Sequence, residues 1–150
     1  KSRYDRRRDT LVVSERGIKK AVSSAIKKGG INIVEGHAAH IIKADIVFVL
    51  RCNPPQLAKR MKKKRWTKDK IGENIEAELL DAVTIEAVEA NGKKKVIEID
   101  TSSRTARKTA VLMKKLLNNH RLQKRYLAGS IDWTERYKKY FSPHEYDMTA

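Results

Sequence analysis

The chain has little cysteine: Cys52 is the only one among 150 residues. A single thiol excludes an internal disulfide and any metal site built from several cysteines. Proteins of oxidising compartments usually carry paired cysteines, so this usage favours a reducing, intracellular setting. We therefore predict a cytoplasmic location.

Long apolar runs are also missing. The longest run, "IVFVL" with its flanks, falls far short of the roughly 20 apolar residues that a membrane span requires. We therefore predict no membrane partner. The opening "KSRYDRRRD" contains no apolar core of a signal peptide. It also lacks a methionine, so we expect that this is not the genetic N-terminus.

Acidic residues are scarce. The chain has 18 Asp and Glu against 34 Lys and Arg, which gives a formal net charge of +16. A positive field of this size attracts polyanions, above all nucleic acid, in a salt-dependent way. A charged surface of the thermophilic kind is the alternative. The excess of basic residues favours contact with nucleic acid or a ribonucleoprotein.

Segments with the pattern of strands alternate with segments that have the pattern of helices. We expect strands at 10–13, 31–36, 44–53 and 93–103, and helices at 14–28, 55–66, 67–91, 104–119 and 120 to about 141. The strands at 31–36 and 44–53 are continuous apolar runs, which indicates burial on both faces. This alternation predicts one α/β domain with a three-layer parallel sheet flanked by helices.

Polar side chains follow three of these strands. In a parallel sheet, ligands bind beyond the carboxyl ends of the strands. The three clusters are Glu35-Gly36-His37, Arg51-Cys52-Asn53 and Asp100-Thr101-Ser102-Ser103. Their expected convergence predicts a binding site at that edge of the sheet.

The first cluster allows several interpretations. Glu35 could hold magnesium through water or orient an attacking group. Gly36 leaves room for a ligand, and His37 could move a proton or bind phosphate. Alternatively, Glu35 pairs with a lysine and the histidines pack against the next helix. A zinc site of Glu35, His37 and His40 is weaker, because no further ligand cluster is apparent.

A strongly basic helix follows the second cluster. Around Trp66 it carries Lys59, Arg60, Lys62, Lys63, Lys64, Arg65, Lys68 and Lys70. These cations could clamp nucleotide phosphates or contact an RNA backbone, or they could form a solvated face. Trp66 could stack on a base or anchor the helix.

Two further features bear on the site. The Arg51 guanidinium, directly after a buried strand, is costly without an anionic partner. The hydroxyl groups of "DTSSRT" could cap the next helix through Ser102 or Ser103. A ligand loop is compatible with a cap, because helix N-termini also suit anions.

Three stretches together resemble the adenylate kinase isoenzyme 6 family, including its archaeal members. These stretches are "IVEGHAAHIIKADIVFVLRCNP", "KRWTKDKIGENIEAELLDAVTIEAVE" and "VIEIDTSSRTARKTAVLM". The resemblance extends from about Tyr4 to Leu117. It implies a P-loop NTPase fold, ATPase activity and phosphoryl transfer between ATP and AMP with Mg²⁺. It also implies a role in small-ribosomal-subunit maturation, with ribosomal RNA or a small-subunit ribosomal protein as partner.

The resemblance also implies roles for individual residues. "VEGH" is similar to a Walker B segment, which implies that Glu35 holds magnesium through water and that His37 takes part in catalysis. Arg60, Lys64 and Arg65 would clamp phosphates from a lid at about 58–72. The implied nucleotide-binding residues are Gly36, Arg51, Ser102, Ser103 and Arg104. The implied divisions are a core at 1–117, containing a nucleoside monophosphate-binding part at about 1–30, and a C-terminal helical extension at 118–150.

The chain departs from the family pattern at two points. It contains no G-x-x-x-x-G-K-[ST] loop, whose amides and lysine hold phosphates, so roughly the first forty residues of the family layout, including the first strand and Walker A, are expected to be absent. Lys64-Arg65 also stand where the family has Arg-Gly, and lysine does not replace a bidentate arginine.

The main functional hypothesis is a nucleoside monophosphate kinase whose activity this chain alone would lack. The alternative is a catalytically impaired ribosome-associated or RNA-binding factor on the same fold.

Overall fold

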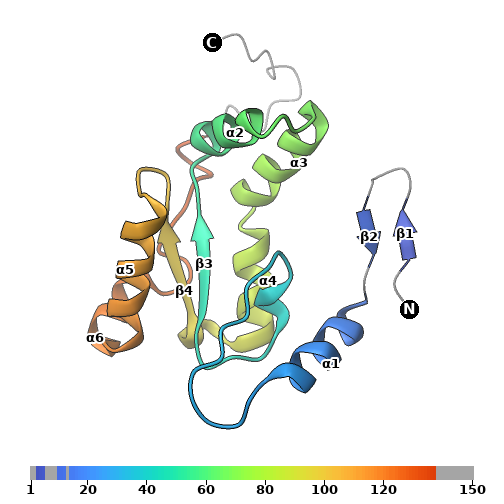
Figure 1. The fold of residues 1–150 in the computed structure, drawn as a ribbon. Coiled ribbons are helices and arrows are strands. Elements are labelled where there is room, and N and C mark those ends of the chain that lie inside the picture. Colours follow the sequence, from blue (N-terminus) through green and yellow to red (C-terminus); the bar gives the residue numbers. More distant parts are fainter. Residues whose placement is uncertain (1–2, 6–9, 13, 138–150) are drawn as a thin grey trace.

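The computed structural model describes residues 3–5, 10–12 and 14–137. Its centre is a parallel pair of strands, β3 (Val47–Arg51) and β4 (Val96–Asp100). Figure 1 shows helix α4 (Ala82–Asn91) on one side of this pair and α5 (Ala106–Leu117) on the other. The predicted α/β architecture, a parallel sheet flanked by helices in three layers, is therefore confirmed.

The two faces of the sheet follow the alternation of side chains along each strand. The face toward α4 is a cluster of Val47, Val49, Val96, Ala87 and Ala128. The face toward α5 is a cluster of Ile97, Ile99 and Leu116, extended by partly buried Phe48 and Leu112. Both faces are covered, which explains why β3 lies in a continuous apolar run.

The remaining elements surround this centre. They are β1 (Arg3–Asp5), β2 (Thr10–Val12), α1 (Glu15–Ala25), η1 (Ala39–Ile41), α2 (Pro54–Lys63), α3 (Lys68–Leu79), η2 (Lys93–Lys95), α6 (His120–Gln123) and η3 (Lys124–Tyr126). Strands β1 and β2 pair antiparallel. None of the helices in the described ranges is long and apolar enough to cross a lipid bilayer.

The strand expected at 31–36 is wrong. The structure places this segment in an irregular conformation, and Ile31 and Ile33 are 84% and 87% exposed. A strand needs a neighbour that supplies backbone hydrogen bonds, and no strand in the described ranges lies along this segment. The Asn32 side chain instead bonds to the backbone N–H and C=O of Lys27.

The single helix expected at 67–91 is also wrong, because it is broken into α3 and α4. Its predicted N-cap is correct: the Thr67 hydroxyl accepts from the Lys70 N–H at 3.3 Å. Ile71, Ile75 and Leu79 are buried as their spacing predicts. The break lies at Asp81, whose φ of 54° is left-handed. Contacts of Asp81 with β3, described below, account for the break.

The helix expected from 120 to about 141 ends early. The last helix in the described residues ends at Tyr126, a single turn follows at Trp133–Tyr137, and 138–141 lie outside the described residues. Leu127 then forms a bridge with Ile97, and the Ala128 N–H donates to the Val96 carbonyl at 3.0 Å. This segment pairs with the edge of β4 because its amides find acceptors there. The division of the chain at residue 117 remains a prediction.

Candidate functional site

Two of the three predicted clusters meet at the carboxyl end of the sheet. The Thr101 N–H and hydroxyl both donate to the Arg51 carbonyl at 2.8 Å. The Asn53 N–H donates to Ser102 Oγ, also at 2.8 Å. The loops after β3 and β4 are therefore joined directly. The Glu35 cluster does not follow a strand, so the strand-end argument holds for two clusters only, and the place of Glu35 at this site stays a prediction.

Ser102 has its local partners within these loops. Its N–H and hydroxyl both donate to Asp100 Oδ1. The predicted cap of the next helix by Ser102 or Ser103 is wrong, because Thr105 is the N-cap of α5 and accepts from the Lys108 N–H at 3.3 Å. The Ser102 side chain is hydrogen-bonded to Asp100 and Ser103 is exposed. Thr105, which directly precedes α5, therefore provides the N-cap.

Arg60 fastens the same loop from α2. Its guanidinium donates to Thr101 Oγ1 at 3.2 Å and to the Thr101 carbonyl at 2.6 Å. It also lies 3.3 Å from the Cys52 sulfur. Burial raises the pKa of the Cys52 thiol, and the nearby Arg60 charge only opposes this shift. Cys52 is therefore a protonated, unreactive thiol beneath the loop.

Arg51 has the anionic partners that its position requires. Its side chain is 2% exposed, and it donates to the carboxylates of Glu78, Asp81 and Glu98. The Thr84 hydroxyl and the Glu78 carbonyl accept its remaining N–H groups. All five donors are thus used within the protein. This arrangement agrees with the expectation that Arg51 steadies the strand end, while direct nucleotide contact remains a prediction.

The Arg51 contacts also explain the break between α3 and α4. Glu78 lies near the end of α3 and Asp81 directly precedes α4, so one guanidinium holds both sides of the break. Burial raises the pKa of Glu78, although Arg51 and the indole N–H of Trp133 stabilise the charged form. Among the described residues, Arg51 is thus the cation that pairs with all three carboxylates.

Glu98 ties the segment after Ala128 to this group. One of its oxygens accepts from Arg51 and Thr84. The other accepts from the consecutive backbone N–H groups of Gly129, Ser130 and Ile131, at 2.8, 3.0 and 3.3 Å. A buried carboxylate in the middle of a strand is tolerated because every oxygen is paired.

The cations of the predicted lid lie at the turn between α2 and α3. Lys64 and Arg65 are exposed, and Arg65 has a left-handed φ of 59°. The Lys70 ammonium lies 4.7 Å from the centre of the Trp66 ring, so a cation covers part of this half-exposed indole. Arg104 is also exposed and donates to the Asp100 carbonyl at 3.1 Å. These side chains are accessible to an anionic ligand.

Glu35, Gly36 and His37 lie in an exposed loop before η1. Within the described part of the chain, the side chains of Glu35 and His37 form no hydrogen bond or ion pair, and Gly36 has open space around its α-carbon. The His40 ring lies 2.7 Å from Glu86 of α4, as the packing alternative predicts for that histidine. Magnesium in kinases takes one or two carboxylates together with phosphates and waters. The accessible Glu35 fits that role as a single donor.

The family model of the AAA domain matches residues 3–81, more than half of the chain. The chain belongs to the AAA domain family. Its similarity to archaeal adenylate kinase-like P-loop proteins, predicted from sequence, is confirmed by three relatives that are each named "Putative adenylate kinase". The proteins of Thermococcus kodakarensis, Archaeoglobus fulgidus and Methanosarcina barkeri are 40%, 41% and 36% identical.

The alignments cover most of this chain and less of some relatives. They include 73%, 67% and 87% of this chain, and 59%, 56% and 74% of the respective relatives. The chain thus spans less than two thirds of the length of the first two. In this AAA domain protein, the matched region 3–81 contains Arg51, the basic α2 and the broken helix as far as Asp81.

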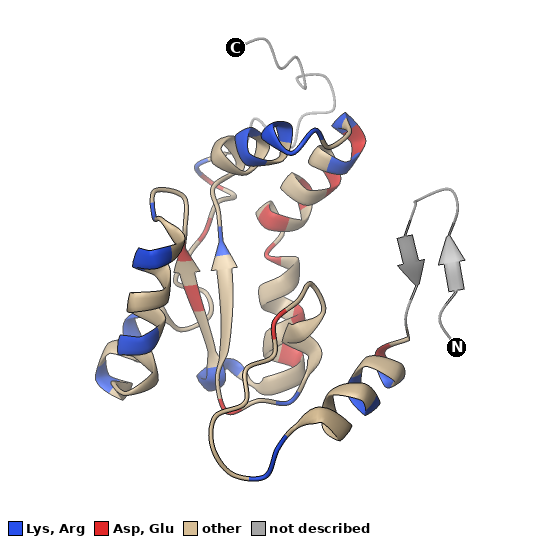
Figure 2. Ribbon diagram, viewed as in Figure 1, with Lys and Arg blue, Asp and Glu red and all other residues tan. Residues whose placement is uncertain are grey.

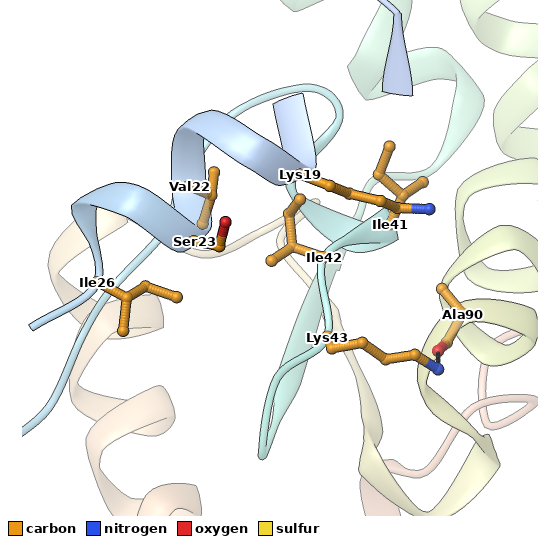
Figure 3. Close-up of a pocket in the computed structure, with 8 residues that line it drawn as sticks. All are labelled: Lys19, Val22, Ser23, Ile26, Ile41, Ile42, Lys43 and Ala90. Atoms are coloured by element: carbon orange, nitrogen blue, oxygen red, sulfur yellow. Dashed lines mark hydrogen bonds between the residues drawn. The ribbon is translucent and has the colours of Figure 1, made fainter. Parts of the chain in front are cut away.

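A concave region lies between α1 and η1, apart from the joined loops (Figure 3). It has a volume of about 440 Å³, and its apolar lining includes Val22, Ile26 and Ile42. Lys19 and Lys43 lie at its edge, and the Lys43 ammonium donates to the Ala90 carbonyl. The predicted apolar face of the helix after Ser14 therefore borders this hollow.

The sequence contained one overlooked signal for the buried charge cluster. Glu98 stands between Ile97 and Ile99 in an otherwise apolar strand, and such a carboxylate requires partners. Its location could have predicted a link to Arg51 on the neighbouring strand. The contribution of Trp133 from the distant C-terminal segment had no comparable signal.

Proposed function

We propose that the natural protein containing this AAA domain chain is a nucleoside monophosphate kinase that converts ATP and AMP into two ADP. The main support from geometry is the joining of the Arg51–Asn53 and Asp100–Ser103 loops at the carboxyl ends of β3 and β4. Parallel α/β sheets bind ligands at this edge. The names of the archaeal relatives support the same reaction.

The exposed residues have the chemistry that this reaction needs. Lys64 and Arg65 would bind the phosphates, whose negative charge they balance. Ser103 and Arg104 would contact the nucleotide beside the joined loops. Glu35 would hold Mg²⁺ through water, and the ion would neutralise charge on the transferring phosphoryl group.

Half-buried Arg60 and buried Arg51 would keep the site in place, whereas exposed residues would face the ligand, namely His37 and Gly36. The Arg60 guanidinium donates to the hydroxyl and the carbonyl of Thr101. To bind a phosphate directly, Arg60 would have to give up these two hydrogen bonds and donate to phosphate oxygens instead. Arg51 would fix the strand end. His37 would orient or deprotonate the attacking phosphate-bearing group, and Gly36 would leave space for it.

The test measures ADP formation from ATP and AMP by the full-length natural protein, with and without Mg²⁺. The double variant Lys64→Ala/Arg65→Ala should lose on the order of a hundredfold in kcat, by analogy with loss of a charge-stabilising donor. Lys59→Ala is the matched control, since Lys59 is an exposed cation of α2 without an assigned role. Absence of ATP turnover both with and without AMP would refute the kinase.

A ribosome-associated or RNA-binding role on the same fold is the second proposal. Its support is the net charge of +16, which favours polyanions independently of catalysis. Maturation of the small ribosomal subunit in the cytoplasm, with ribosomal RNA or a small-subunit ribosomal protein as partner, fits this role. Salt-dependent RNA binding without any ATP turnover would support an RNA-binding factor in place of the kinase.

A further inference from the structure

The basic residues are distributed unevenly along the chain. Residues 101–131 contain eight Lys and Arg but no Asp or Glu. One of the eight, Arg104, belongs to the loop described above. The other seven lie on α5, α6 and η3 or next to them. We call these seven the α5 basic face: Arg107, Lys108, Lys114, Lys115, Arg121, Lys124 and Arg125.

The four helical cations of α5 lie away from the core. Thr109 and Leu116 are buried, and Leu112 and Met113 pack against the sheet. Arg107 and Lys114 are separated by two helical turns, as are Lys108 and Lys115, so each pair shares a side of the helix. All seven residues of the α5 basic face are exposed. None of them forms an ion pair with another described residue.

Negative charge is concentrated on the opposite side of the sheet. Residues 68–91, which include α3 and α4, contain seven Asp and Glu but only two Lys. Figure 2 shows acidic colour on α3 and α4, and basic colour on α5 and α6. The sheet lies between α4 and α5, and with about 10 Å between packed layers the two helical layers are about 20 Å apart. Since screening in physiological salt acts over about 8 Å, the acidic side neutralises the α5 basic face very little.

We propose that the α5 basic face binds the phosphate backbone of duplex RNA. The cations extend over three consecutive elements, which suits an extended polyanion more than a single phosphate. Tyr126 is the only Phe, Tyr or Trp in 101–131, and it is partly buried against the sheet. His120 is the one exposed ring on the face, and its Nδ1 lies 3.1 Å from Gln123 Oε1, so the face lacks the series of stacking platforms typical of single-strand binding. Asn118 is exposed and lies between α5 and α6. Its amide can form hydrogen bonds with ribose 2′-hydroxyls in the shallow minor groove of an RNA duplex.

This inference deepens the RNA-binding proposal and does not depend on phosphoryl transfer. Its test uses fluorescence anisotropy of a labelled RNA duplex of about 20 base pairs, titrated with the full-length protein between about 50 and 200 mM KCl. The test variant is Arg107→Gln/Lys114→Gln/Lys115→Gln. The matched control is Lys20→Gln/Lys27→Gln/Lys28→Gln, which removes the same charge from exposed positions on and after α1.

The α5 variant should bind duplex RNA about tenfold more weakly or worse, and the slope of log affinity against log salt should fall by about 2–3, since each lost phosphate contact removes about 0.9. The α1 control should keep most of the slope. Equal losses in both variants, or no loss in the α5 variant, would overturn the proposal. Thermal unfolding followed by circular dichroism should give both variants the same midpoint as the parent.

Two competitors identify the partner. A DNA duplex of the same length and a polyglutamate chain should each displace the RNA at least tenfold less effectively. Equally effective competition by either one would overturn the assignment to RNA. ADP formation by the α5 variant should equal that of the parent, so the kinase and the RNA-binding face can fail separately.

Discussion

Replacing Arg51 tests the central electrostatic feature of the fold. Arg51→Met keeps much of the apolar stem but removes the cation that, among residues 3–5, 10–12 and 14–137, pairs with Glu78, Asp81 and Glu98. The Glu98 side chain is 0% exposed, so its charge cannot be solvated instead. Breaking a buried pair by removing one partner costs about 3–5 kcal/mol. Domains have only about 5–15 kcal/mol of stability, so the loss is a large part of the total.

Urea unfolding measures this loss directly. With a slope near 2 kcal/mol/M, the unfolding midpoint should fall by about 1.5–2.5 M. Arg51→Lys should lose less than Arg51→Met, because it retains the charge but offers three donors in place of five. Arg107→Met on the exposed side of α5 is the matched control and should change stability by at most about 0.5 kcal/mol. A loss below about 1 kcal/mol in Arg51→Met, or equal losses in the methionine and lysine variants, would refute the reasoning.

Three further predictions concern backbone conformation and pH. Arg65→Gly should raise the free energy of unfolding by about 0.5–1 kcal/mol, because φ at this position is 59° and glycine adopts it without strain; an unchanged or lower urea midpoint would contradict this. Gly129→Ala, at φ 88°, should lower the same quantity by about 1 kcal/mol, whereas Gly72→Ala within α3 should raise it by about 0.5–1 kcal/mol; equal signs would argue against the conformational explanation. The pKa of Glu78 is raised above 4.5, so its contribution is fully present below that pH and is lost as pH rises through the folded pKa. Unfolding from pH 4 to 7 should therefore show the parent losing stability relative to Glu78→Gln, and parallel curves would contradict the shift.

The sequence predicted those parts of the fold that local patterns determine. The apolar run at 46–50 indicated a buried strand, the half-alternating segment 93–103 indicated a further strand, and Thr67 marked the start of α3. The partner of Arg51 was anticipated as anionic, because a buried guanidinium requires one. Each of these inferences depends on a residue's own neighbours or on the cost of burial, which a sequence displays directly.

The errors came from contacts between distant segments. The β-branched run at 31–34 has strand propensity, but pairing with a neighbour decides whether a strand forms. The helical pattern through 67–91 gave no sign of a break. The break depends on ion pairs of Glu78 and Asp81 with Arg51 of β3, and a local pattern does not contain these contacts. The position of Trp133 likewise depends on Glu78, whose carboxylate accepts from the indole N–H at 2.8 Å. The roles of the exposed site residues remain predictions.

The broken helix connects the buried charge cluster to the proposed phosphate-binding turn. Arg51 fixes the end of α3 at Glu78, and Lys64 and Arg65 lie just beyond its other end. A helix of 12 residues is about 18 Å long. Tilting α3 by about 10° at its break would therefore move the turn by roughly 3 Å, which is the length of a hydrogen bond. Cations that must meet phosphates within that distance depend on the angle at the break. The Arg51 cluster thus influences the positions of Lys64 and Arg65, although it makes no contact with them.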